Sequence, residues 1–154
     1  MALPAHPTSS PSESSREFAR RIVARELGAN SGDAALLIAV ERVCARVGES
    51  LSRLFGPYGS LALLTRALAR AQTFEKSLSA ITVSSAPVPS LRGFAESAGA
   101  NGAQATAESA VALLAVLGDL IGRLIGADLA LSLLEQGANG SSTAGDVQQK
   151  EHAQ

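Results

Sequence analysis

The chain has 154 residues, of which 46% are hydrophobic, and a formal net charge of -1. This length fits one domain with a core of ordinary size, and the balanced charge argues against a protein that binds polyanions through bulk charge. The sequence holds four Phe, one Tyr and no Trp, while Ala and Leu dominate. Because strong helix formers are abundant and β-branched and aromatic residues are scarce, the composition predicts an all-α fold with an aliphatic core.

Two features of the sequence predict a cytoplasmic protein. Cys44 is the only cysteine, so one chain can form neither an internal disulfide nor a sulfur-based metal cluster. Met1 is followed by Ala-Leu-Pro-Ala rather than by a charged region and a long apolar stretch, so we expect no secretory signal.

Capping signals and apolar spacing define the first helices. Ser14, with Glu17 three residues later, predicts a capping box for a helix that ends near Gly28. Asp33 can cap a second helix, which ends at Gly56-Pro57, and a third helix over about 60–72 is expected to fold back against it as a hairpin. The apolar face of the second helix consists of Leu36, Val40, Val43, Val47, Leu51 and Leu54.

The middle of the chain gives weaker signals. Residues 73–89 are expected to be irregular, with a few extended residues near Ile81, and a short helix is predicted from Ser90 to about Ser97 before a glycine-bearing linker over 99–102. Together the segments predict a compact bundle of about five or six helices. Residues 1–11 and 137–154 are expected to be disordered tails around a single helical domain, 12–136.

An almost unbroken apolar run extends from Ser109 to Leu134. An ordinary surface helix needs a polar side, and ionisable residues within the run make a bilayer span expensive. We therefore predict a buried central helix over about 104–126 and no integral membrane span. Residues 129–135 either form a separate helix or continue the central one as a single kinked helix.

Glycine recurs every fourth residue in this run, at Gly118, Gly122 and Gly126. Glycine in a helix interior costs up to about 1 kcal/mol relative to alanine, and close approach of a second helix would offset that loss. The candidate groove or interface residues are Gly118, Gly122, Gly126, Leu117, Ile121 and Ile125. We favour a helix of the same chain as the partner over a second subunit, although both can hold.

Three ionisable residues, Asp119, Arg123 and Asp128, interrupt the apolar run. They could bind a small ligand as buried polar groups, or Asp119 and Arg123, one helical turn apart, could form a solvent-facing ion pair of little energetic value. We favour the second interpretation.

The sequence offers no recognisable catalytic constellation. The two histidines, His6 and His152, lie in the expected tails, and Cys44 is flanked by apolar positions that favour a packing role. Arginines on the first two helices alternate with glutamates, which indicates a solvated mixed surface rather than a nucleic-acid site. No nucleotide-binding or zinc pattern is present, so we expect neither an enzyme nor a bound cofactor or metal.

The leading hypothesis is a non-enzymatic interaction or assembly module. It would self-associate as a homodimer, or dock on a larger protein, through an apolar helix face, because large aliphatic residues exceed what one small core can hide. The alternative is a regulatory domain that binds an apolar small molecule or lipid in a cavity between helices.

Overall fold

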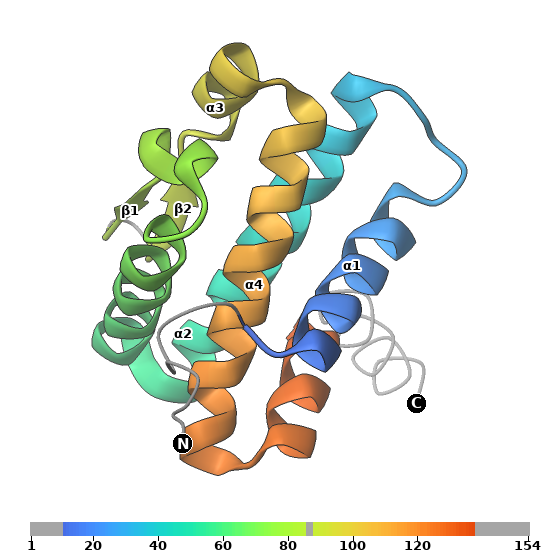
Figure 1. Cartoon of the computed structure of the whole chain (residues 1–154). Helices are drawn as coiled ribbons and strands as arrows, with labels where there is room; N and C mark the ends of the chain where they lie inside the picture. The colour runs from blue at the N-terminus through green and yellow to red at the C-terminus, as the bar shows by residue number, and fades with distance from the viewer. Residues whose placement is uncertain (1–10, 86–87, 138–154) are drawn as a thin grey trace, which may run out of the picture.

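Helix α4, Ala103–Ile125, forms the centre of the fold (Figure 1). The fold is that of a computed structural model, which describes residues 11–85 and 88–137. Residues 109–118 of α4 are all buried. Because successive helical side chains point in different directions around the axis, other elements must cover α4 on every side. The predicted central helix and the all-α fold are confirmed.

Helix α1, Glu13–Leu27, packs against both α4 and α2, and its residues Phe18, Ile22 and Val23 are buried in the core. Its N-cap is Ser12, whose hydroxyl accepts a hydrogen bond from the Ser15 N–H at 3.2 Å. The prediction that Ser14 caps this helix is therefore wrong. Ser12 also donates hydrogen bonds to Asp119 of α4, so the helix begins where its first turn contacts α4.

Helix α2, Asp33–Gln72, is bent at Gly56, where φ is 79° and ψ is 165°. The bend separates a first arm, 33–55, which passes behind α4 in Figure 1, from a second arm, 57–72, which returns along the side of α4 away from α1. The predicted stop at Gly56-Pro57 is confirmed, but the connection is one residue rather than four. Proline suits the first helical position and keeps the residue before it out of the helical region, so Gly56 alone makes the corner.

The segment after α2 forms a 3-10 helix η1, Lys76–Ala80, and a small antiparallel sheet of β1, Thr82–Ser84, and β2, Ser90–Arg92. Val83 pairs with Leu91 in this sheet. The prediction that a helix begins at Ser90 is therefore wrong, because the strand pairing of residues 90–92 is a contact with a distant segment that local spacing does not reveal.

Helix α3, Phe94–Asn101, begins directly after Gly93. A Cβ atom on Gly93 would lie 2.2 Å from the carbonyl oxygen of Ala80, so only glycine allows the chain to pass this close to η1. Helix α3 extends through most of the predicted 99–102 linker, and Gly102 alone separates it from α4.

Gly126, with φ of 100°, ends α4, and a further helix follows over residues 127–137. The 118–134 segment is therefore two helices rather than one. Ala130 and Leu134 of the last helix are buried in the core. The expected disordered tails, 1–11 and 137–154, lie outside the described residues apart from Pro11 and Gly137.

The 127–137 helix packs over the glycine positions of α4. A Cβ atom on Gly118 would lie 3.1 Å from Leu134 Cδ1, and one on Gly122 would lie 3.5 Å from the Cα of Ala127. The close partner of these glycines is thus a helix of the same chain, which is the interpretation that the sequence favours.

Substitutions at Gly122 should distinguish the helix-propensity cost of glycine from the need for close packing against the last helix. A single Cβ meets Ala127 at ordinary contact distance, so Gly122→Ala should be tolerated or raise the free energy of unfolding by up to about 1 kcal/mol through helix propensity. Gly122→Leu should lower it by about 1–3 kcal/mol, because the larger side chain must displace the last helix. Urea denaturation measures both, and equal stability of the Ala and Leu variants would contradict close packing at this position.

Candidate functional site

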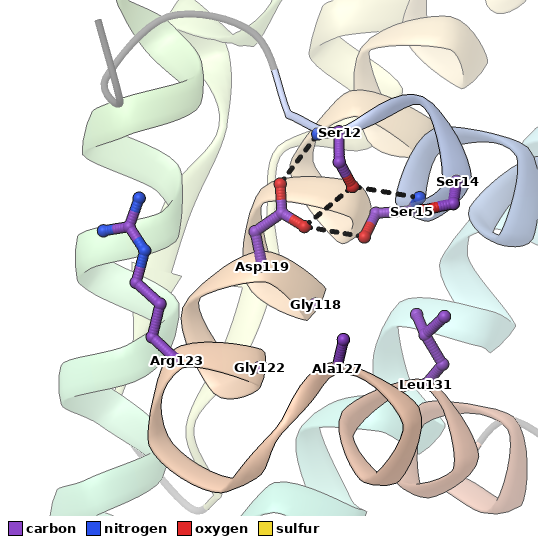
Figure 2. Close-up of a pocket in the computed structure, with 9 residues that line it drawn as sticks. All are labelled: Ser12, Ser14, Ser15, Gly118, Asp119, Gly122, Arg123, Ala127 and Leu131. Carbon is purple, nitrogen blue, oxygen red and sulfur yellow. Dashed lines mark hydrogen bonds between the residues drawn. The ribbon is translucent and has the colours of Figure 1, made fainter.

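A pocket of about 300 Å³ lies where the start of α1, the C-terminal half of α4 and the 127–137 helix meet (Figure 2). Its lining includes two of the three predicted polar candidates, Asp119 and Arg123, and two of the predicted glycines, Gly118 and Gly122. This volume is at the lower end of the range for small-molecule sites. The pocket is therefore the first place to test the ligand hypothesis.

Asp119 is held by three hydrogen bonds from the beginning of α1 (Figure 2). The Ser12 N–H donates to Oδ2 at 2.8 Å, and the Ser12 and Ser15 hydroxyls donate to Oδ1 at 3.0 and 2.7 Å. Charge-assisted bonds of this kind are roughly twice as strong as neutral ones, and a carboxylate is favoured at the positive end of a helix. Asp119 thus fastens the first turn of α1 to α4.

The hydrogen bonds of Asp119 join two elements of the fold. Both carboxylate oxygens of Asp119 accept hydrogen bonds from Ser12 or Ser15, so both have partners within the fold. Ser15 is 6% exposed, so its hydroxyl depends on Asp119 for a partner. Local sequence spacing does not predict Ser12 and Ser15 as partners of Asp119, because 107 and 104 residues separate them from it.

Arg123 points away from Asp119 in Figure 2, and no ion pair or hydrogen bond joins the two within the described part of the chain. The predicted Asp119–Arg123 pair is therefore not formed. Asp128 is exposed in the first turn of the 127–137 helix and lies outside the pocket lining. The three polar candidates do not form one cluster.

The apolar candidates divide between the core and the surface. Leu117 and Ile121 are 1% and 0% exposed, so no partner can reach them in the folded chain, whereas Ile125 is half-buried at the end of α4. Gly118 and Gly122 are covered by the last helix, and Gly126 forms the exposed turn.

Arginine side chains on the first two helices form ion pairs with glutamates. Glu26 of α1 pairs with Arg42 and Arg46 of α2, and Arg25 pairs with Glu135 at 3.1 Å. The charges on this side of the protein are therefore partly used within the fold.

Cys44 is 4% exposed on the buried face of α2. Burial, with a smaller contribution from Glu41, raises the pKa of its thiol to about 12. Since the thiolate is the reactive form, the thiol is inert near neutral pH, in line with the packing role expected from the sequence.

Four large apolar side chains are strongly exposed at one end of the protein, which we call the apolar end. Leu54 and Tyr58 flank the α2 corner, and Leu124 and Leu129 flank the turn at Gly126. Figure 1 places both corners at the lower end, and Leu54 lines a small crevice together with Leu133 of the last helix. Apolar spacing predicts core-facing positions for Leu54, Leu124 and Leu129, and their exposure shows that prediction to be wrong. It makes no prediction for Tyr58.

Other classes of site receive no support from the described residues. Within residues 11–85 and 88–137, no group of three or more His, Cys, Asp or Glu side chains could hold a metal ion. None of the described helices has both the length and the apolar character needed to cross a membrane. Comparison with protein-family models, curated proteins and solved structures finds no match to this chain.

We predict that Asp119 stabilises the fold and Arg123 does not. Asp119→Ala leaves the Ser15 hydroxyl and the first turn of α1 without their acceptor and should lower the free energy of unfolding by about 1–3 kcal/mol. Arg123→Ala is the matched control and should change it by less than about 0.5 kcal/mol. Chemical denaturation measures both, and equal losses in the two variants would argue for the ion pair instead.

Cys44 predicts a specific loss of stability at high pH. The folded-state pKa of about 12 lies above the reference value of 9.0, so the thiol's contribution is complete below pH 9 and is lost as the pH rises toward 12. The free energy of unfolding should fall across this window by up to about 1.4 kcal/mol per pH unit from this group. Cys44→Ala should reduce that slope in denaturation curves collected from pH 8 to 11, and an unchanged slope would refute the assignment.

Proposed function

We propose that the protein is a non-enzymatic assembly module that associates with a second copy of itself through the apolar end. The supporting observation is the exposure of Leu54 (51%), Tyr58 (87%), Leu124 (64%) and Leu129 (53%). Single exposed apolar residues are ordinary on protein surfaces, but gathered ones mark partner surfaces. These four belong to two neighbouring corners at one end.

The energetics of burial favour association through these side chains. Covering a largely exposed leucine contributes on the order of 1 kcal/mol, in proportion to the apolar area removed from water. Several such residues together can offset part of the entropy lost on association. Because Leu124 and Leu129 contribute little to the monomer core, their exposure has no evident purpose within a single chain.

The alternative, an apolar ligand held between helices, has less support. The crevice beside Leu51, Ile121 and Leu134 holds about 10 Å³, which is space for about one water molecule. The pocket at Asp119 carries a carboxylate and an arginine, which do not suit a lipid chain. A pocket of about 490 Å³ beside β2 and α3 likewise has charged side chains in its lining, those of Glu41, Arg92 and Glu96. A catalytic role has little support from two described residues, since Asp119 is engaged in hydrogen bonds within the fold and Cys44 stays protonated near neutral pH.

Sedimentation equilibrium over a wide range of protein concentrations tests the proposal. We expect the mass of the wild type to rise from 15.7 kDa toward twice that value. The double variant Leu124→Glu/Leu129→Glu should keep the monomer mass, because burying two carboxylates at the contact is costly. Its thermal unfolding should be nearly unchanged, as both positions are exposed.

Ile38→Glu is the matched control. Ile38 is 47% exposed, but it lies near the α1–α2 connection at the opposite end of the protein. This variant should associate like the wild type. A wild type that stays at 15.7 kDa at every concentration would refute self-association.

A further inference from the structure

The corner of α2 depends on one residue. Gly56 is the only position in Asp33–Gln72 with non-helical φ and ψ, and a Cβ atom there would meet no other atom within 4 Å. Gly59 belongs to the same corner, because a Cβ on it would lie 2.9 Å from Phe55 Cβ. A change in the dihedral angles of Gly56 therefore separates the bent form from a continuous 40-residue helix.

The sequence of α2 retains the spacing of a continuous helix across the corner. Side chains that are mostly apolar recur at alternating intervals of four and three residues, which places them on one face of an unbroken helix. These positions are Val40, Cys44, Val47, Leu51, Leu54, Tyr58, Leu61, Thr65 and Leu68. In the bent helix the two halves of this stripe face different directions. The regular spacing therefore places these residues on one face only when α2 is straight.

The bent form leaves groups at the corner unsatisfied. The two stripe residues that flank it most closely, Leu54 and Tyr58, are 51% and 87% exposed. Leu51 before the corner and Leu68 after it are buried, while Leu61 is half-buried and Thr65 is exposed. The hydroxyls of Ser52 and Ser60 are buried without a hydrogen-bond partner in the described structure.

We propose that the corner is a hinge through which two copies of this chain exchange arms. When α2 straightens in both copies, α1 and the first arm of one copy pack against α4 of the other, and the same core contacts form between chains. A two-fold axis at position 56 places Leu54 opposite the partner's Tyr58, since the two positions are equally far from the axis. The second copy thus covers the side chains that the bend exposes.

Pro57 holds the hinge in the bent form. Its ring clashes with the carbonyl four residues earlier in a continuous helix, and it keeps Gly56 out of the helical region. Straightening α2 is therefore unfavourable, so the exchanged dimer is populated only at high protein concentration. This inference rests on the proposed self-association and specifies that the two copies associate by exchanging arms at Gly56.

The double variant Gly56→Ala/Pro57→Ala tests the hinge. Removing the proline and the flexible glycine should raise the dimer association constant by more than about ten-fold. The dimer should also persist after dilution for as long as the chain takes to unfold, because return to the monomer requires opening the core. Adding Tyr58→Ser should lower the dimer fraction, whereas adding the control Ile38→Glu, at an exposed position near the opposite end of the protein, should leave the dimer fraction unchanged.

Two results would overturn arm exchange. The first is a folded double variant that stays monomeric at every concentration. The second is a dimer that dissociates within the mixing time, is abolished by Leu124→Glu/Leu129→Glu and forms equally well in Gly56→Ala/Pro57→Ala. That result would overturn arm exchange but leave the proposed self-association intact. If the double variant does not fold, refolding the wild type decides the question: a slowly dissociating dimer whose yield rises with concentration supports exchange, and its absence refutes it.

Discussion

The structure depends on removing the central part of α4 from water on all sides. Side chains such as Leu113, Leu117 and Ile121 are almost fully buried, and each contributes about 1.5–3 kcal/mol relative to exposure. Exposed ion pairs such as Arg25–Glu135 contribute about 0–1 kcal/mol each. The arrangement of α1, both arms of α2, α3 and the last helix therefore follows from the need to cover one helix that has no polar side over residues 109–118.

The charged residues of α4 lie where this cover ends. Asp119 follows directly after the buried stretch and accepts hydrogen bonds from the first turn of α1, so its carboxylate is compensated by dipoles instead of by a basic side chain. Arg123, one turn later, is exposed. The same apolar run thus changes from core to surface within about one helical turn, and the exposed Leu124 and Leu129 are its continuation past the core.

Exposed apolar side chains lie at the two corners of the fold, because at a corner the helix leaves the core. At Gly126 the turn brings the last helix back over Gly118 and Gly122, and at Gly56 it directs the second arm along α4. Each turn leaves apolar side chains outside. Association through these residues and exchange of arms at Gly56 are separable events, since the first needs only exposed surface and the second needs the helix to straighten.

Composition, apolar spacing and glycine are local signals, and they suffice to predict the helical class, the central position of residues 104–126 and the breaks at Gly28, Gly56 and Gly126. Three further features follow from the three-dimensional fold alone: Asp119 bonds to Ser12 and Ser15, residues 90–92 pair as a strand, and Leu54 lies outside the core. Each of these depends on segments distant in sequence, so spacing within one helix carries no information about them. The glycine spacing is an intermediate example. It predicts that another helix packs closely against Gly118 and Gly122, but the turn at Gly126 determines that this helix is residues 127–137.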